Sequence, residues 1–330
     1  MLQFFAQQYL GFDVASAGEI QSLRALGVPG KDMALCSPIK DVSSLQSLFT
    51  EQISTFTFDT IAELDRIMAT KKALGIEISP SALVRMRVES TNVDVDLNAK
   101  FGCDEAEAPA LLAQAQQAGF QAQGIAFHVG TQCYEVENYV RALQQAQRVA
   151  QQVQERFGIT VPVIDIGGGF CDLETAYKAG IDLDSFFREL AQACQAALAQ
   201  GYQLCAQPGR FLVSSAGYLV TQVIGEAMRG GKRWLYLDDG IYGALSCRTY
   251  EKTRYTFHPL RALTGKPIPT VLAGPTCDSL DIVDTDALQP EDLTIGDLLL
   301  TPSVGAYSLS TATTFNGFAP PPCFLVEAPL

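Results

Sequence analysis

Three stretches of the sequence carry residues that could bind an anion or transfer a proton. In the first, an apolar run at residues 163–166 ends in Gly167, Gly168 and Gly169. Glycines after a buried strand leave backbone N–H groups uncovered, so an anion such as a phosphate can approach them closely. Such a cluster is more often a tight turn than a phosphate site. From these residues alone, the tight turn is therefore favoured.

The second stretch, at residues 207–210, follows another apolar run and ends in Gly209 and Arg210. A guanidinium group offers a fork of N–H donors that matches a phosphate, and Tyr307 could add a hydroxyl donor. His128, which ends a further apolar run, could stack on a flat cofactor. A lone histidine is, however, more often a structural residue.

The third stretch places Cys277 next to Asp278. A thiol can donate a proton to a reacting carbon, and a carboxylate can bind the cationic end of a substrate. From these residues alone, a buried thiol and a turn aspartate are the favoured alternative.

The composition is that of an ordinary globular protein, with 330 residues, 48% apolar and 18% charged. The net charge of −13 argues against nucleic acid or an anionic membrane surface as the main partner. No apolar run approaches the roughly 20 residues of a membrane span, and the first residues lack the basic leader of a signal peptide. Nine dispersed cysteines and two histidines predict reduced thiols in a cytoplasmic protein, and no metal site.

The order of the predicted elements indicates an α/β fold. Short apolar runs alternate with helical stretches over residues 1–215, which predicts parallel βαβ units. One helix is expected at 136–157, where apolar residues recur with helical period and Gly158 follows. A (β/α)8 barrel that lacks its first strand fits the number of units. Functional groups of such barrels lie at the C-terminal ends of the strands, where Asp13 and His128 fall.

The pattern changes after residue 215. Helical periodicity stops, and strand-like runs separated by Gly and Pro turns appear at 219–224, 234–237, 270–273 and 298–301. We therefore expect a second domain at 216–330 that is mainly antiparallel β.

Taken in order, these stretches resemble the pyridoxal 5′-phosphate (PLP) dependent amino-acid decarboxylases, in the group that contains ornithine decarboxylase. The matching motifs include Phe12-Asp13-Val14-Ala15-Ser16, Phe127-His128-Val129-Gly130, Gly274-Pro275-Thr276-Cys277-Asp278 and Thr314-Phe315-Asn316-Gly317-Phe318. The resemblance covers essentially the whole chain. It implies a PLP-binding barrel and a C-terminal β domain, assembled as a head-to-tail homodimer with shared active sites. Lys100 and Asp281 match a pair that bridges the dimer interface in that group.

The resemblance also implies roles for individual residues. His128 would stack on the PLP ring, and Cys277, acting from the partner subunit, would protonate the carbon that loses CO2. Asp239, Asp278 and Phe315 would bind the substrate, with the two carboxylates on its distal ammonium group. The residues expected to hold the cofactor are Asp13, Arg87, His128, Thr131, Gly167, Gly168, Gly169, Gln207, Gly209, Arg210 and Tyr307.

The residues after Cys277 favour a basic amino acid as the substrate. They are Asp278-Ser279-Leu280-Asp281, which resembles the ornithine and lysine enzymes, whereas the diaminopimelate enzymes carry a Glu-Ser-Gly-Asp pattern there. Ornithine, converted to putrescine for polyamine synthesis, is the first expectation, and lysine is the second. A non-catalytic relative of the antizyme-inhibitor type is the alternative from another class. An alanine-racemase-like enzyme is disfavoured by the Cys277 region.

Two departures from the family pattern bear on activity. The lysine that forms the Schiff base with PLP belongs upstream of residues 12–16, and none of the lysines, including Lys31, Lys40 and Lys71, stands in its motif. We therefore expect the sequence to be a fragment of a longer protein, and inactive as it stands. Gln207 replaces the glutamate of the family's Glu-Pro-Gly-Arg motif. Because an amide carries no charge to favour a protonated pyridine nitrogen, Gln207 is expected to lower activity.

Overall fold

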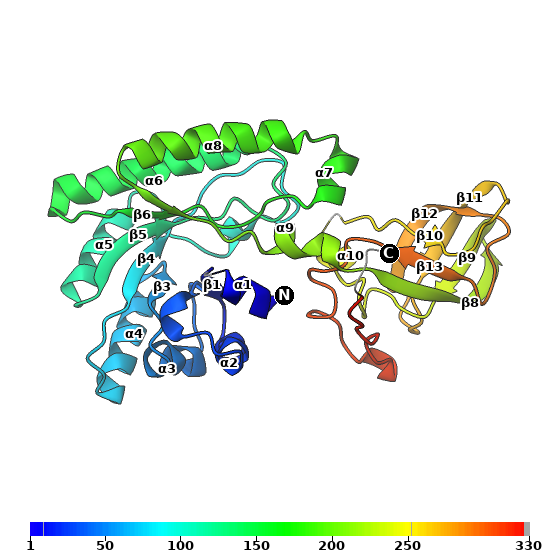
Figure 1. Cartoon of the computed structure of the whole chain (residues 1–330), viewed down its shortest axis with the longest axis horizontal. Coiled ribbons are helices and arrows are strands. Elements are labelled where there is room, and N and C mark those ends of the chain that lie inside the picture. The colour runs from blue at the N-terminus through cyan, green and yellow to red at the C-terminus, as the bar shows by residue number, and fades with distance from the viewer. Residues whose placement is uncertain (9, 252, 327–330) are drawn as a thin grey trace. The chain divides into compact units, whose positions relative to one another are not determined.

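The computed structural model describes residues 1–8, 10–251 and 253–326, and it divides the chain into two compact units (Figure 1). The first unit contains residues 1–169 and 182–208, and the second contains 170–181 and 209–330. The chain therefore passes between the units three times, whereas the sequence pattern predicts one boundary after residue 215. The segment 170–181 belongs to the second unit because its side chains bond there. For example, Thr256 Oγ1 donates to Glu174 Oε1 at 3.0 Å.

The first unit is built on a curved, entirely parallel sheet of seven strands that are hydrogen-bonded in chain order. The strands are β1 (Phe12–Val14), β2 (Met33–Leu35), β3 (Thr55–Phe58), β4 (Ser81–Arg85), β5 (Gln121–Ala126), β6 (Val163–Asp165) and β7 (Gln203–Cys205). This arrangement confirms the prediction of a (β/α)8-type barrel without its first strand.

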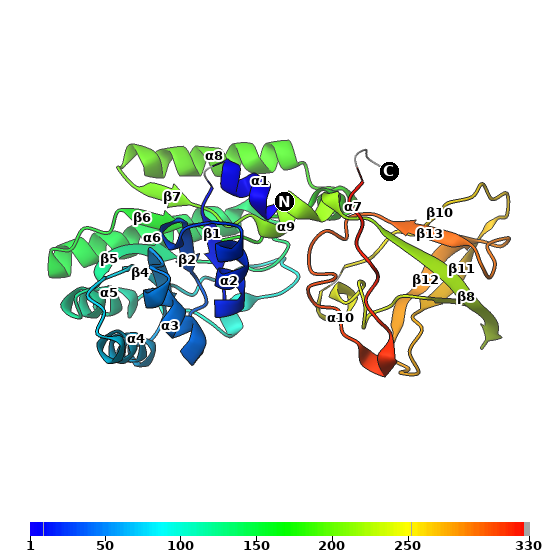
Figure 2. The ribbon, with the colours of Figure 1, turned by 60° about the horizontal axis from the view of Figure 1, so that its bottom comes forward.

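Helices precede and connect these strands: α1 (Leu2–Gln7), α2 (Ala17–Ala25), α3 (Val42–Thr50), α4 (Ile61–Leu74), α5 (Ala108–Gln117), α6 (Val136–Phe157) and α8 (Leu183–Ala199). Neighbouring helices pack in sequence from α2 to α6, and α8 packs on α6. Figures 1 and 2 show them on the outer side of the curved sheet. The helix predicted at 136–157 has these bounds in the structure, and Gly158 ends it in the left-handed conformation at φ 67°.

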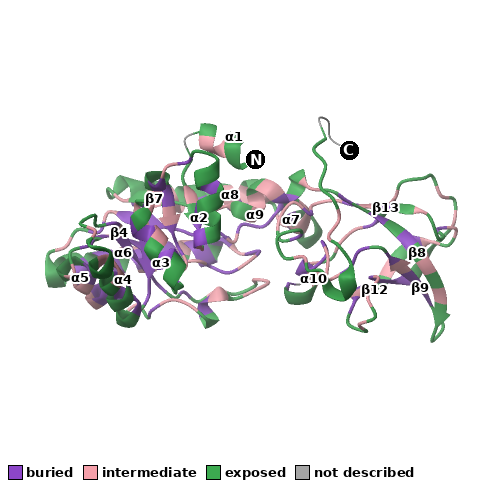
Figure 3. Cartoon of the chain, turned by 90° about the horizontal axis from the view of Figure 1, so that it is seen from below, coloured by how far each residue is buried: buried purple, intermediate pink, exposed green. Residues whose placement is uncertain are grey.

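The core of the first unit lies between the sheet and these helices. Phe56 is buried and packs edge-on against Phe120 with 5.1 Å between ring centroids, and Ile125 and Ile164 are fully buried on the central strands. In Figure 3 the buried residues follow the strands, and the exposed residues lie on the outer faces of the helices. Strands β4 and β6 are buried at nearly every residue, which explains the apolar residues at their centres.

The second unit contains a separate six-stranded sheet in the order β10-β13-β8-β9-β11-β12. All neighbouring strands are antiparallel except β9 and β11, which are parallel, so the prediction of a mainly antiparallel β domain is confirmed. The strands are β8 (Leu219–Arg229), β9 (Lys232–Leu237), β10 (His258–Pro259), β11 (Pro267–Ala273), β12 (Ile282–Pro290) and β13 (Leu298–Thr301). Three short helices accompany them: α7 (Leu173–Ala179), α9 (Gly209–Val213) and α10 (Cys247–Tyr250).

Side chains from most of these strands form the core of the second unit. Val223, Leu235, Leu272 and Leu299 are among its fully buried members. Among the residues that the structure describes, no helix has the length and apolar character needed to cross a membrane.

Candidate cofactor and substrate sites

Polar side chains gather where the parallel strands of the first unit end. Because these strands run in one direction, their C-terminal ends share one edge of the sheet. The charges of these side chains shift one another's pKa values. The carboxylates of Asp165 and Asp13 raise the pKa of Arg85, and the Arg85 guanidinium lowers the pKa of His128. We call the following residues the strand-end cluster: Asp13, Cys36, Arg85, His128, Asp165 and Gln207.

Asp165, the last residue of β6, organises this cluster through hydrogen bonds. Its Oδ1 accepts the Gly167 N–H at 2.9 Å, and its Oδ2 accepts the Gln207 Nε2–H at 2.8 Å. The backbone N–H of Gln207 in turn donates to the Gly167 carbonyl at 2.8 Å. The ends of β6 and β7 are therefore tied together, and the orientation of the Gln207 amide is fixed.

The glycines after β6 allow the loops at the strand ends to approach one another. Gly167 and Gly169 have positive φ values of 68° and 89°. A Cβ atom on Gly167 would lie 2.3 Å from the Phe127 carbonyl oxygen, and one on Gly169 would lie 2.0 Å from that of Gly130. Local packing therefore requires glycine at both positions, as the tight-turn interpretation expects. A role in binding phosphate remains a proposal.

His128 is held as a neutral imidazole. Its Nδ1 accepts the Gly130 N–H at 2.9 Å, which leaves the proton on Nε2. Burial and the nearby Arg85 guanidinium lower the pKa of His128 to about 3. A neutral ring in a fixed orientation suits stacking on a flat cofactor.

The low pKa of His128 predicts a specific loss of stability in mild acid. In the unfolded chain the histidine has its usual pKa of 6.5, so below that pH the unfolded chain binds a proton that the folded chain does not. As the pH is lowered below 6.5, the free energy of unfolding should therefore decrease. The contribution of His128 to this decrease is up to about 1.4 kcal/mol per pH unit. Urea unfolding at pH 7 and pH 5 should show about 1–2 kcal/mol more loss in the wild type than in His128→Asn. Equal losses in the two proteins would contradict this prediction.

Arg85 is the buried guanidinium of the cluster. Its Nε and Nη2 atoms are buried and have no hydrogen-bond partner among the described residues. Burial lowers the pKa of Arg85, although Asp165 opposes this effect. Two unsatisfied N–H donors in a buried site favour the binding of an anionic or hydrogen-bond-accepting ligand.

The sequence analysis names Arg87 as a cofactor-binding residue, and the structure places it apart from Arg85. Arg87 is exposed, pairs with Asp104, and does not join the strand-end cluster. The reason is that β4 ends at Arg85, whereas the sequence pattern extends the strand to residue 88.

Asp13 and Thr131 also lie at the strand ends. Asp13 is exposed on the edge strand β1, where desolvation of its carboxyl, followed by the charge of Asp165, raises its pKa to about 7. Thr131 pairs through its backbone with Val95, and its N–H donates to the Val95 carbonyl at 2.9 Å. Of the cofactor residues expected in the first unit, the structure therefore brings Asp13, His128 and Gln207 together.

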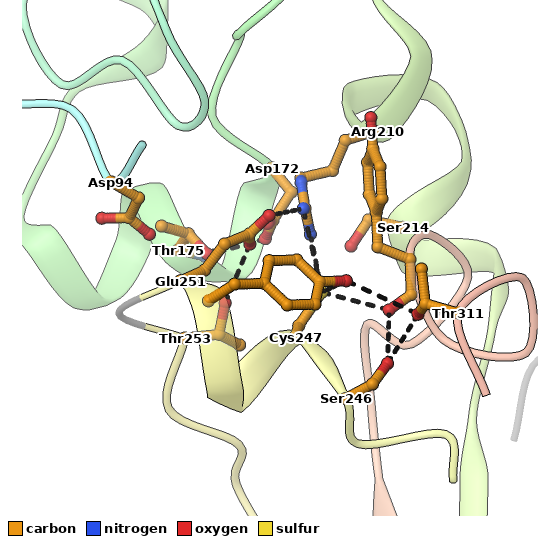
Figure 4. Close-up of polar contacts among 12 residues, drawn as sticks. Asp94, Asp172, Thr175, Arg210, Ser214, Ser246, Cys247, Glu251, Thr253 and Thr311 are labelled. Atoms are coloured by element: carbon orange, nitrogen blue, oxygen red, sulfur yellow. Dashed lines mark hydrogen bonds and ion pairs between the residues drawn. The ribbon is translucent and has the colours of Figure 1, made fainter. Parts of the chain in front are cut away.

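In the second unit, Gly209 and Arg210 begin α9, and Arg210 lies in a polar pocket (Figure 4). Its Nη2 lies 2.5 Å from Glu251 Oε1, and both side chains are largely buried. The guanidinium lies over the Tyr307 ring at 4.5 Å from the centroid. The lining of the pocket includes Asp172, Thr175, Lys178 and Arg210. Glu251 therefore compensates the positive charge that the sequence analysis assigns to a phosphate.

A second group of residues in this unit, the loop cluster, joins three of the expected site residues. Its members are Tyr242, Cys277, Asp278, Phe315 and Asn316. Both the backbone N–H and the Sγ of Cys277 donate to Asn316 Oδ1 at 3.2 Å. Tyr242 donates its hydroxyl to Asp278, and its ring lies against Phe315 with 4.5 Å between centroids and 31° between the ring planes. Cys277 is exposed, which excludes the buried-thiol alternative, and Asp278 is half-buried.

Asp239, the other carboxylate expected to bind the substrate, is buried in its own turn. Its Oδ1 accepts the N–H groups of Gly240 and Ala244 at 2.7 and 3.1 Å. Burial raises its pKa to about 6. Asp281 is also buried, and it connects this turn to the segment before Cys277, because it accepts the Ile241 N–H and the Thr276 hydroxyl. Asp278 is thus the more accessible of the two expected ligands.

Several residues of these sites are missed by the sequence analysis. Asp165 and Cys36 lie inside apolar runs, where a polar residue surrounded by β-formers is the available signal. Glu251, Tyr242 and Asn316 are brought to their partners by contacts across 39 to 73 residues, and local periodicity carries no such information.

Comparison with known proteins places the chain in a family. The pyridoxal-binding domain of the pyridoxal-dependent decarboxylases matches residues 1–214. The lysine/ornithine decarboxylase of Selenomonas ruminantium is 37% identical over 96% of this chain and 77% of the relative. Antizyme inhibitor 2 of Xenopus laevis is 29% identical over 98% of this chain and 72% of the relative. The crystal structure of SrLDC in complex with PLP and cadaverine superposes with a TM-score of 0.87 at 35% identity, over 99% of this chain and 80% of that one.

The chain belongs to the PLP-dependent decarboxylases, whose members remove the carboxyl group of amino acids. The cofactor of this family is PLP.

The strand-end cluster fits that cofactor. Arg85 offers unsatisfied N–H donors for the acceptor oxygens of PLP, and His128 presents a neutral ring. The Gln207 amide can form a hydrogen bond with a ring nitrogen.

Proposed function

We propose that the protein in its native form decarboxylates L-ornithine to putrescine as part of polyamine synthesis, whereas the sequence as it stands is expected to be inactive. The observation that carries this proposal is the loop cluster, in which the exposed Cys277 is followed directly by the half-buried Asp278. A thiol can supply the proton that replaces the lost carboxyl group, and a carboxylate can hold a distal ammonium group. Relatives named as lysine and ornithine decarboxylases support a basic substrate.

PLP supplies an electron sink for the electron pair that remains when CO2 departs. The proposed roles of the protein's own residues divide by type. His128 stacks on the cofactor ring, and Thr131 lies near the phosphate. The phosphate is held by backbone N–H groups, a guanidinium and a hydroxyl group, contributed by Gly167, Gly168, Gly169, Gly209, Arg210 and Tyr307.

Substrate binding is assigned to Asp278, with Asp239 and Phe315 as further contacts. We propose that Cys277 acts in the active site of a second copy of the chain, so that the working unit is a homodimer. The exposure of Cys277 supports a site that is completed by another subunit. Dispersed cysteines support a reducing, cytoplasmic location.

The test measures CO2 and amine products from the PLP-loaded protein. Ornithine should give putrescine faster than lysine gives cadaverine, and diaminopimelate, with a distal carboxylate, should give no product. Asp278→Ala should raise KM for ornithine about tenfold or more, since it removes one charge-assisted contact of about 1.5–3 kcal/mol. Faster turnover of lysine than of ornithine would reverse the substrate assignment.

A non-catalytic role is the second candidate, and the similarity to antizyme inhibitor 2 supports it. It predicts that no basic amino acid loses CO2 even when PLP is bound. That outcome would replace the catalytic proposal. A phosphopyridoxyl adduct found by mass spectrometry after borohydride reduction of the protein from its native host would favour catalysis instead.

A further inference from the structure

Gln207 is oriented by its neighbour so that its carbonyl oxygen is free. The Nε2–H donates to Asp165 Oδ2 at 2.8 Å, and a carboxylate cannot donate in return. The Gln207 Oε1 atom consequently points away from Asp165, and it has no hydrogen-bond partner in the described part of the chain. An oxygen in this state can only accept a hydrogen bond.

We assign the negative charge next to this amide to Asp165 rather than to Asp13, because Asp165 has the hydrogen-bond donors that favour a carboxylate. Each oxygen of Asp165 accepts one N–H group, from Gly167 and Gln207. Arg85 also favours its ionised form, whereas burial opposes it and raises its pKa. Asp13 has no such pair of N–H donors, and its raised pKa of about 7 allows it to keep a proton when Asp165 is ionised.

We propose that Asp165 is a positioning residue that makes Gln207 a hydrogen-bond acceptor, so that Gln207 Oε1 holds the pyridine nitrogen of PLP in its protonated form. This inference rests on the cofactor role proposed above. A ring nitrogen meets an acceptor only if it carries a proton. The missing charge at position 207 is then supplied by a buried carboxylate one hydrogen bond away. Gln207 is thus compatible with a strong electron sink.

The experiment follows the ring nitrogen itself rather than turnover. Pyridoxamine 5′-phosphate labelled with ¹⁵N in the ring is bound to the protein, and its nitrogen chemical shift reports protonation. The pH is set where the nitrogen of the free molecule is unprotonated. The wild type should show a protonated nitrogen. Asp165→Asn should show an unprotonated nitrogen and about tenfold weaker binding, since a neutral amide neither fixes Gln207 nor supplies charge.

An exchange of the two groups provides the sharpest test. Asp165→Asn combined with Gln207→Glu moves the carboxylate to position 207 and should restore the protonated signal. Asp41→Asn removes another carboxylate of the same unit, at the N-cap of α3, where asparagine caps equally well. It should leave the signal unchanged.

The remaining outcomes would contradict either the role of Asp165 or the proposed function. A protonated nitrogen in Asp165→Asn, or an unprotonated one in the wild type, would overturn the role of Asp165 while leaving the cofactor assignment intact. A wild type that fails to bind the labelled molecule at all would overturn the proposed function, and the role of Asp165 with it.

Discussion

Replacing Glu63 with alanine is expected to lower the free energy of unfolding of the first unit by about 3–5 kcal/mol. Glu63 Oε1 lies 3.6 Å from Lys40 Nζ, and the two side chains are 1% and 0% exposed. Lys40 Nζ also donates to the Thr57 carbonyl at 2.6 Å. Without Glu63, the Lys40 ammonium is left buried without a countercharge. Burial already lowers the pKa of Lys40 to about 8.

Urea unfolding of Glu63→Ala measures this loss, and an exposed ion pair provides the matched control. Glu51 pairs with Arg24 at 2.9 Å, where the two side chains are 36% and 44% exposed. Glu51→Ala should cost less than about 1 kcal/mol, because water solvates the remaining partner. Equal costs for the two variants would show that the buried pair does not carry the stability assigned to it.

Replacing Arg210 with methionine is expected to weaken PLP binding about 100-fold. Charge-assisted hydrogen bonds to a phosphate are worth about 1.5–3 kcal/mol each, and tenfold in affinity corresponds to about 1.4 kcal/mol. Arg210→Lys should weaken binding less, about tenfold, since it keeps the charge and loses the fork of donors. Fluorescence titration with PLP measures both dissociation constants.

A second variant separates binding from folding. Arg210→Met alone leaves Glu251, which is 3% exposed, without its partner and could destabilise the second unit. Combining it with Glu251→Gln removes the buried negative charge that Arg210 neutralises in the wild type. If this double variant binds PLP within threefold of the wild type, Arg210 does not hold the phosphate.

The sequence predicts the first unit well where local patterns determine the structure. The helix at 136–157 is correct at both ends, because its apolar residues follow the helical period and Gly158 adopts the left-handed conformation that ends it. Strand β12 is not singled out, because its Asp284 and Asp286 interrupt the apolar pattern. The segment 170–181 is assigned to the wrong side of the domain boundary, because its partners lie some 80 residues further along the chain.

In the candidate sites, too, the sequence predicts what depends on local motifs and misses what depends on distant contacts. Cys277, Asp278 and Phe315 are found from the sequence and meet in the loop cluster. Strand β4 ends at Arg85, earlier than the sequence pattern predicts. Because of this difference, the buried arginine is Arg85, whereas Arg87 is exposed. Pairs such as Arg210 with Glu251 depend on the tertiary fold, and the sequence pattern gives no indication of them.

The threefold passage of the chain between the two units has a consequence for synthesis on the ribosome. Residue 208 is the last residue of the first unit to emerge. Helix α7 (Leu173–Ala179) emerges before that point, yet Lys178 and Glu174 bond to Arg254 and Thr256. The partners of helix α7 are therefore synthesised more than 70 residues after it. Strand β7, which follows α7 in the sequence, can pair with the parallel sheet before these partners emerge. The order of translation favours folding of the first unit before the second.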